Sequence, residues 1–176
     1  MDSIQAHGVH HITLVGADRE TSMAFWEGVM GFPFVFEQPN LDDPNENHLY
    51  FEPGDGRLIT IFTDETRTPT DGRTPQVPGA VHHIAFNMGA EAFEAALDRL
   101  KAHGIRNSGV KDRGFMHSIY FREPLGLTIE LATYTFEPPQ GVDHTGVLKR
   151  AFEIRQASGD ASIAQTHVDQ AVKALS

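Results

Sequence analysis

The sequence predicts an α+β fold in which one β-α-β-β-β unit occurs twice and is followed by a helical tail. Residues 9–12 and 81–84 carry the same four amino acids, Val-His-His-Ile. In both copies a tyrosine lies ten positions before a residue in the last expected strand, with Tyr50 before Thr60 and Tyr120 before Glu130. A shared opening and a shared spacing are typical of an internal repeat. We therefore expect two small units that together build one site.

The composition restricts both the size of the protein and its chemistry. A chain of 176 residues corresponds to about one domain. The 14 Lys and Arg against 24 Asp and Glu give a net charge of −10, which argues against nucleic acid or a membrane as a partner. The ten His and the absence of Cys exclude disulfides, thiolate zinc sites and Cys nucleophiles. Any bound metal must therefore use imidazole or oxygen ligands.

The first copy is expected over residues 8–63. An alternating strand over 11–15 comes first, and a helix that ends at Gly31 follows it. Further strands complete the unit, and the last two are joined by a turn that contains Pro and Gly. Residues 64–79 are rich in Pro, Gly and Thr and are expected to form a linker. The helix is predicted from four apolar residues at helical spacing: Phe25, Trp26, Val29 and Met30.

The second copy is expected over residues 80–136, with its elements in the same order. A strand over 83–87 precedes a helix that ends at Gly104. The helices of both copies should cover the convex side of a cupped mixed sheet. Two apolar stripes between about 143 and 175 predict further helices. We therefore predict a single domain over 1–136 and a helical extension over 137–176.

The N-terminal residues are not expected to form a secretory signal. Residues 1–7 lack a basic segment followed by an apolar run, so we expect no secretory signal. No stretch approaches about 18 consecutive apolar residues, so no membrane span is expected. Together with the absence of Cys, this makes a cytoplasmic location the expectation.

Strand alternation assigns three polar side chains to the open face of the sheet. Because side chains alternate along a strand, His11, His83 and Glu130 each oppose a face that is purely apolar. A carboxylate within an apolar strand is costly unless it is paired or coordinated. Two imidazoles and one carboxylate form the facial ligand set of non-heme Fe(II) oxygenases. We therefore predict that these three residues lie in mid-strand and bind a metal.

The first copy has Thr60 at the position that corresponds to Glu130 in the second. A four-ligand site would need a carboxylate there, and Thr fills that role poorly. Three protein ligands would leave coordination positions for a bidentate substrate and dioxygen. The sequence therefore favours a three-ligand site.

Several of these side chains also have ordinary structural explanations. A single His in an apolar setting is more often a hydrogen-bonded core residue than a ligand. Tyr50 and Tyr120 are each consistent with an ordinary aromatic residue of the core, and Arg113 is consistent with a solvent-exposed turn residue. His48 and His117 stay open, because each lies just before a Tyr-Phe pair. The remaining histidines are expected at the surface: His7, His103, His144 and His167.

These features resemble the vicinal oxygen chelate superfamily, which includes glyoxalases, bleomycin-resistance proteins and extradiol dioxygenases. The resemblance covers about residues 8–136. Within the superfamily, residues 8–14, 81–86 and 117–133 resemble the hydroquinone-type ring-cleaving dioxygenases, and the last segment is the most specific. Those dioxygenases carry four repeats where this chain has two. The resemblance thus implies a site that is more open, or one that a partner chain completes.

The resemblance implies a metal site and its surroundings. The metal would be Fe(II), with Mn(II) or another divalent ion as the alternative, held by His11, His83 and Glu130. Tyr120 and Arg113, which lie ten and 17 positions before the metal-binding Glu, would surround the substrate.

The resemblance also assigns supporting roles next to the metal ligands to His10, His82 and Thr13. Simple strand alternation would place His10 and His82 on the helix side of the sheet. Their supporting role therefore follows from the resemblance alone.

The leading hypothesis is dioxygen-dependent cleavage of a hydroxylated aromatic ring, with a small aromatic compound and O₂ as partners. One alternative is a metal-dependent isomerase, lyase or thiol transferase that acts without oxygen, although Thr60 weakens it. Another is a non-catalytic protein that binds a small aromatic compound and needs no metal. Paired β-α-β-β-β units often complete their sheets by dimerising, and the apolar stripes of the tail add surface, so a homodimer is expected.

Overall fold

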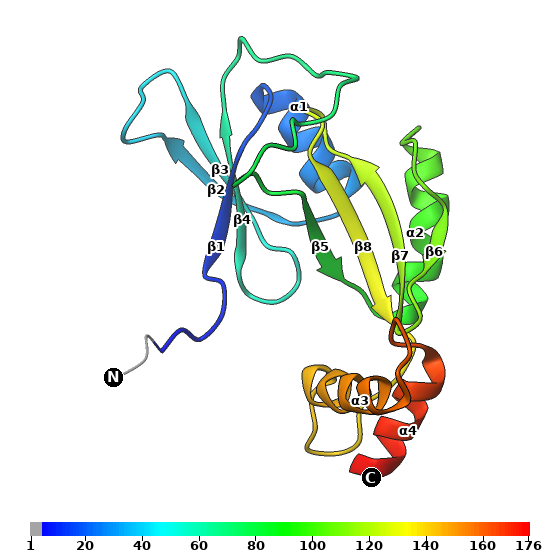
Figure 1. Cartoon of the computed structure of the whole chain (residues 1–176). Coiled ribbons are helices and arrows are strands. Elements are labelled where there is room, and N and C mark those ends of the chain that lie inside the picture. Colours follow the sequence, from blue (N-terminus) through cyan, green and yellow to red (C-terminus); the bar gives the residue numbers. More distant parts are fainter. Residues whose placement is uncertain (1–4) are drawn as a thin grey trace. The chain divides into compact units, whose positions relative to one another are not determined.

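The computed structural model describes residues 5–176, which contain two four-stranded sheets (Figure 1). The strand order is β1-β4-β3-β2 in the first sheet and β5-β8-β7-β6 in the second. Each sheet is built from one of the two predicted repeats, and each repeat has a helix after its first strand. The predicted α+β fold of two β-α-β-β-β units is therefore confirmed.

The first repeat begins with β1 (His11–Val15), which pairs in parallel with β4 (Leu58–Thr63). Between them lie α1 (Arg19–Met23), a π-helical continuation η1 (Ala24–Val29), β2 (Phe34–Pro39) and β3 (Asn47–Phe51). The Asp18 side chain caps α1 by accepting the backbone N–H of Thr21 at 2.7 Å. Antiparallel pairing of β2 with β3 and of β3 with β4 completes a mixed sheet.

The two faces of the first sheet differ as alternation predicts. The register pairs Thr13 with Thr60 and Thr60 with Tyr50, so these three residues share one face. The opposite face is apolar and buried, together with the apolar residues of the first helix: Leu49, Phe51, Ile59, Ile61, Phe25, Trp26 and Val29. Burial of these side chains supplies the main favourable free energy of the unit.

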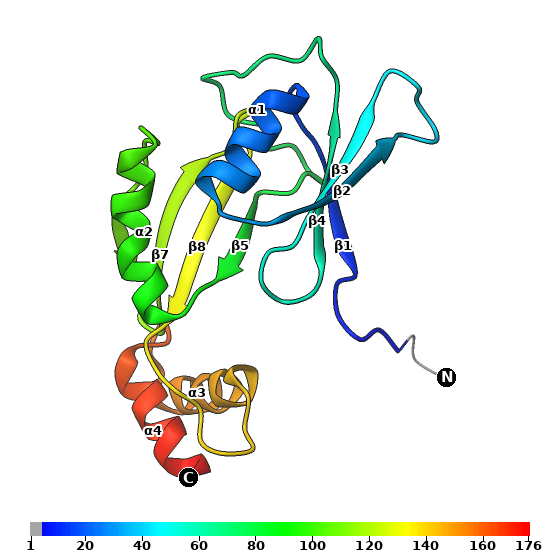
Figure 2. The same ribbon diagram turned by 180° about the vertical axis from the view of Figure 1, so that it is seen from behind.

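The second repeat follows the same plan. Its elements are β5 (His83–Asn87), α2 (Ala90–Ala102), β6 (Val110–Asp112), β7 (Met116–Arg122) and β8 (Thr128–Tyr134). Helix α2 runs along the second sheet in both views (Figures 1 and 2). The buried apolar residues of α2 and of the sheet are Ile84, Phe93, Ala96, Leu100, Ile119, Phe121, Ile129 and Leu131.

The predicted helical tail is a hairpin of α3 (His144–Ser158) and α4 (Gln165–Leu175). Asp143 caps α3 by accepting the N–H of Gly146 at 2.7 Å, and Gly159 ends it at φ +78°. Val147, Ala151, Val168 and Ala171 form the completely buried core of the hairpin. The apolar stripes thus pack against each other.

The linker is held against the turn between β7 and β8. The backbone N–H of Thr70 donates to Pro124, and that of Thr74 donates to Gly126 at 3.1 Å. Gly126 has φ +92°, and a Cβ added there would lie 2.5 Å from the carbonyl oxygen of Gly72. Only glycine accommodates this close approach of two backbone segments.

Backbone packing divides the chain into two compact units. Unit 1 comprises residues up to 84, 99–105 and 122–129, and unit 2 comprises 85–98, 106–121 and 130–176. The predicted division into 1–136 and 137–176 stays a prediction. No helix within residues 5–176 combines the length and apolar character needed to cross a membrane. Residues 1–4, on which the expectation of no secretory signal partly rests, lie outside the described residues.

Candidate functional site

The two His-His pairs have the same local geometry. Nδ1 of His10 lies 2.8 Å from Nδ1 of His11, and Nδ1 of His82 lies 2.8 Å from Nδ1 of His83. Both pairs have ring centroids 5.1 Å apart and nearly perpendicular rings. In such a contact one Nδ1 donates and the other accepts. If His11 is the donor, the lone pair of its Nε2 is the one suited to a metal.

The structure corrects two expectations about these pairs. His11 and His83 are the first residues of β1 and β5, so neither lies in mid-strand. His10 and His82 precede the strands, so alternation does not apply to them and does not place them on the helix side. Each can therefore turn toward its neighbour. The supporting role that the resemblance assigned to His10 and His82 now has a contact that fits it.

Glu130 lies in the middle of β8, and only 2% of its surface is exposed. The hydroxyl of Tyr120, on the neighbouring strand β7, donates to Glu130 Oε1 at 2.9 Å. The backbone N–H of Tyr120 is itself bonded to Ser108 Oγ at 3.0 Å. A buried carboxylate needs such donors, because desolvation penalises its charge. Tyr120 is therefore more than a plain core aromatic.

Arg113 lies in the turn between β6 and β7, where its backbone N–H bonds the carbonyl of Met116 at 2.9 Å. Its guanidinium carbon lies 5.4 Å from the centre of the Tyr120 ring. This distance is within the range of cation–π attraction. Arg113 is thus a turn residue, as expected from the sequence. It also brings a positive charge close to the Tyr120–Glu130 pair.

Thr60 is completely buried, and its hydroxyl donates to the hydroxyl oxygen of Thr13 at 2.8 Å. The position that corresponds to Glu130 thus holds a short side chain that is engaged with a neighbouring strand. Thr13, which the resemblance placed beside the metal ligands, receives its orientation from this contact.

Two further polar contacts involve histidines, one within the first sheet and one just before β5. The hydroxyl of Tyr50 lies 2.8 Å from Nδ1 of His48. Burial and the neighbouring His11 lower the pKa of His48. Arg73 of the linker comes within 3.4 Å of His82 Nε2. The alternation that places His48 and Tyr50 on one face was visible in the sequence, whereas the linker contact was not.

The three predicted ligands lie in different units of the chain. His11 and His83 belong to unit 1, and Glu130 belongs to unit 2. In the part of the chain that the structure describes, no three His, Asp or Glu side chains are grouped so as to hold a metal ion. The three-ligand set stays a prediction.

A repeated β-α-β-β-β unit, with a histidine opening the first strand of each copy and a buried glutamate in the last strand, defines a class of paired-module proteins. Residues 8–131 match the family model of the Glyoxalase/Bleomycin resistance protein/Dioxygenase superfamily. The chain belongs to this superfamily, and the resemblance seen in the sequence is confirmed.

Two curated relatives come from Bacillus subtilis (strain 168), and both are named as ring-cleaving dioxygenases. MhqO is 39% identical over 128 residues, which cover 70% of this chain and 39% of MhqO. MhqA is 28% identical over 127 residues, which cover 72% of this chain and 39% of MhqA. The chain therefore spans about two fifths of the length of these relatives.

A similar solved structure is that of the fosfomycin resistance protein FosX from Listeria monocytogenes, in complex with Mn(II) and a sulfate ion. The TM-score is 0.55 at 23% identity, and the match covers 75% of this chain and 96% of FosX. This likeness shows the shared fold.

Proposed function

We propose that the protein is a non-heme Fe(II)-dependent dioxygenase that cleaves a hydroxylated aromatic ring of the hydroquinone or catechol type. Membership of the superfamily and the names of MhqO and MhqA support this reaction class. A small aromatic substrate and dioxygen would be its partners. We further propose a homodimer, which a mass measurement in solution at micromolar concentration would test against a monomer.

The main observation that supports the proposal is the environment of the Thr60 side chain. Its position is equivalent to that of Glu130, yet its hydroxyl is buried and bonded to Thr13. A site without a second carboxylate keeps open positions for a bidentate substrate and O₂, as in non-heme Fe(II) oxygenases.

The donor chemistry of the chain fits a divalent metal. The proposed ligands are His11, His83 and Glu130, with Mn(II) or another divalent ion as the alternative to Fe(II). The Nδ1 contacts of the two histidine pairs resemble the hydrogen bonds that orient metal-binding imidazoles. When bound, the metal would supply Lewis acidity toward a substrate hydroxyl and the redox chemistry that O₂ requires.

The surrounding residues would then have distinct roles. Tyr120 orients the Glu130 carboxylate through its 2.9 Å hydrogen bond. Arg113 supplies a fixed positive charge, which favours an anionic substrate oxygen near the Tyr120 ring. His10 and His82 orient the histidines that follow them, and His10 is placed beside a proposed metal ligand, where a ring nitrogen would accept a substrate proton.

Oxygen uptake after anaerobic loading with Fe(II) tests the proposal. We expect uptake with hydroquinones or catechols, and ring-opened products that contain oxygen from O₂. A fully iron-loaded sample that consumes no oxygen across such a panel contradicts ring cleavage. Activity without oxygen in the presence of Mn, Zn or Ni would instead indicate an isomerase, lyase or thiol transferase. A purified protein that binds aromatic compounds but no metal would indicate a binding protein.

A further inference from the structure

The two equivalent tyrosines of the repeats have different partners. Tyr120 donates to the Glu130 carboxylate at 2.9 Å. Tyr50 lies opposite Thr60 in the register of β3 and β4, where no carboxylate is present. Its hydroxyl contacts Nδ1 of His48 at 2.8 Å instead. The first repeat thus contains a tyrosine–histidine pair at the place where the second contains a tyrosine–carboxylate pair.

The hydrogen-bond network around Tyr50 indicates which atom donates. Burial lowers the pKa of His48, and the charge of His11 lowers it further against an opposing effect of Glu46, which favours the neutral imidazole. The side-chain amide of Gln38 donates to the Tyr50 oxygen at 3.4 Å. Tyr50 is then free to donate its own proton to Nδ1 of His48, which leaves the histidine proton on Nε2.

Packing alone does not explain why a histidine occupies position 48. Its Nε2 is one of three buried side-chain nitrogen or oxygen atoms in the described residues that lack a hydrogen-bond partner. The ring lies against Tyr50 and Phe62, with centroid distances of 4.2 and 4.3 Å. An unmet buried polar atom destabilises a fold, and an apolar side chain at this position would avoid that effect. What His48 does contribute is a fixed orientation of the Tyr50 hydroxyl.

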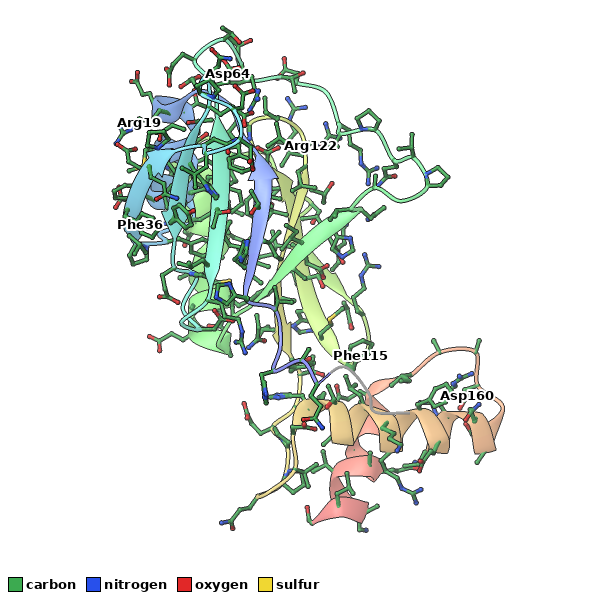
Figure 3. The ribbon with its side chains drawn as sticks, turned by 90° about the vertical axis from the view of Figure 1, so that its left-hand side faces the viewer. Arg19, Phe36, Asp64, Phe115, Arg122 and Asp160 are labelled. Carbon is green, nitrogen blue, oxygen red and sulfur yellow. The ribbon has the colours of Figure 1, made fainter. Side chains whose placement is uncertain are left out.

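An aromatic surface adjoins this hydroxyl. The ring of Phe36, labelled on β2 in Figure 3, is stacked on the ring of Tyr50 with centroids 4.0 Å apart and an angle of 15°. Phe36 is 42% exposed, although it is a large apolar residue. The register places both rings on the face of the sheet that carries His11 and Thr13. A flat apolar surface beside a fixed hydroxyl suits an aromatic ring with a polar end.

The spacing on this face indicates which ring would fit. His11 pairs with Leu58, and Tyr50 pairs with Thr60, so His11 and Tyr50 are two strands and two residues apart. With a strand spacing of about 4.8 Å and a rise of about 3.3 Å per residue, their Cα atoms are about 12 Å apart. Hydroxyl groups at opposite ends of a benzene ring extend toward both residues. Adjacent hydroxyl groups lie at one end of the ring only.

We propose that the Tyr50 hydroxyl, oriented by His48 and flanked by Phe36, binds the substrate hydroxyl that is remote from His11. Tyr50 is the binding residue and His48 is a positioning residue. The pair selects a 1,4-dihydroxy ring over a 1,2-dihydroxy ring. This inference rests on the proposed function, because it assumes that the first substrate hydroxyl lies at the metal site.

Calorimetry on the 176-residue chain, loaded with Fe(II) under anaerobic conditions, tests the subsite without catalysis, because no O₂ is present. The probes are hydroquinone and catechol. We expect Tyr50→Phe, which keeps the stacked ring, to weaken hydroquinone binding about tenfold, because one hydrogen bond is lost. Catechol binding should change less than about twofold. Tyr134→Phe is the matched control, because Tyr134 stacks on His144 in unit 2 and stands outside the subsite.

Variants of His48 separate positioning from packing. We expect His48→Leu to weaken hydroquinone binding as Tyr50→Phe does, while its thermal unfolding midpoint stays equal or rises. His48→Gln, whose amide oxygen can accept the Tyr50 proton, should recover part of the affinity. Equal hydroquinone binding by Tyr50→Phe and the unchanged protein overturns the subsite. Equal losses for both probes, or no binding of either probe to the unchanged protein at millimolar concentration, also overturn it.

Oxygen uptake by the iron-loaded protein distinguishes a failure of the ring-cleavage proposal from a failure of the Tyr50 subsite proposal. If no oxygen is consumed but Tyr50→Phe still discriminates between the probes in calorimetry, ring cleavage fails and the subsite stands. If oxygen is consumed and Tyr50→Phe keeps the KM for hydroquinone, the subsite fails and ring cleavage stands. We expect a higher KM for hydroquinone in Tyr50→Phe, with a smaller effect on kcat.

Discussion

The hydroxyl of Tyr120 donates a 2.9 Å hydrogen bond to Oε1 of Glu130, from one strand of the second sheet to the next. Glu130 is 2% exposed, so water contributes little to the solvation of its carboxylate. A carboxylate in this position depends on donors from the protein and, under the proposed function, on a metal ion. The pair therefore connects the stability of the fold to the candidate site.

Replacement of Tyr120 by Phe removes this donor and keeps the ring. We expect a loss of about 1–3 kcal/mol in the free energy of unfolding, because a buried charged acceptor loses a partner. Metal affinity should fall about tenfold or more, as for other residues that orient a metal ligand. Urea unfolding and metal titration measure the two effects. Tyr134→Phe serves as the control, and an unchanged metal affinity in Tyr120→Phe would speak against the assigned role.

Metal content identifies the ligands. We expect elemental analysis of the native protein to give stoichiometric metal, and His83→Ala to lose it, because removal of one of three ligands leaves a weak site. The exposed His103, which follows the last residue of α2, provides the control variant His103→Ala, which should retain the metal. Full metal content in His83→Ala would exclude His83 from the ligand set.

Thr60 should matter for stability and not for metal content. Thr60→Val keeps the shape of the side chain but removes the 2.8 Å bond to Thr13, so we expect a loss of about 1 kcal/mol in the free energy of unfolding. Thr63→Val is the contrast, because the Thr63 hydroxyl is buried without a hydrogen-bond partner, and its removal should cost nothing. Loss of metal from Thr60→Val would indicate that Thr60 acts as a fourth ligand.

Glu123 should give the protein a pH-dependent stability. Burial raises its pKa above the ordinary value of 4.5, against the opposing effect of two backbone N–H donors, from Leu125 and Leu127. The folded state therefore binds this proton more tightly than the unfolded state does. The resulting stabilisation is present below pH 4.5 and is lost as the pH rises through the folded-state pKa.

Glu123→Gln removes this titration and retains an oxygen that can accept both N–H groups. We expect the stability of the variant to rise relative to the unchanged protein as the pH increases from about 4 to about 8 in urea unfolding experiments. Glu52→Gln is the matched control, because Glu52 accepts the N–H groups of Gly54 and Gly56 in the equivalent turn of the first repeat. Parallel pH profiles for Glu123→Gln and the unchanged protein would show that burial of Glu123 has no such effect.

Much of the fold could be predicted from the sequence, because its repeats and its alternation are local patterns. Period-two alternation placed Glu130 opposite a purely apolar face of its strand, and Ile129 and Leu131, its neighbours in β8, are buried. The apolar stripes likewise predicted the tail helices that α3 and α4 now form. The exact start of a strand is not encoded in this way. Alternation therefore does not decide the side on which His10 and His82 lie, since β1 and β5 begin one residue after them.

By itself, the sequence determined which residues share a face and that Tyr50 and Tyr120 are equivalent, because strand periodicity and repeat spacing follow from the order of residues alone. Only the tertiary structure decided their partners. Tyr120 bonds Glu130, whereas Tyr50 bonds His48. A hydrogen bond depends on distances of a few tenths of an ångström between side chains on neighbouring strands. Such distances are set by the packing of the whole sheet and not by the residues of either strand alone.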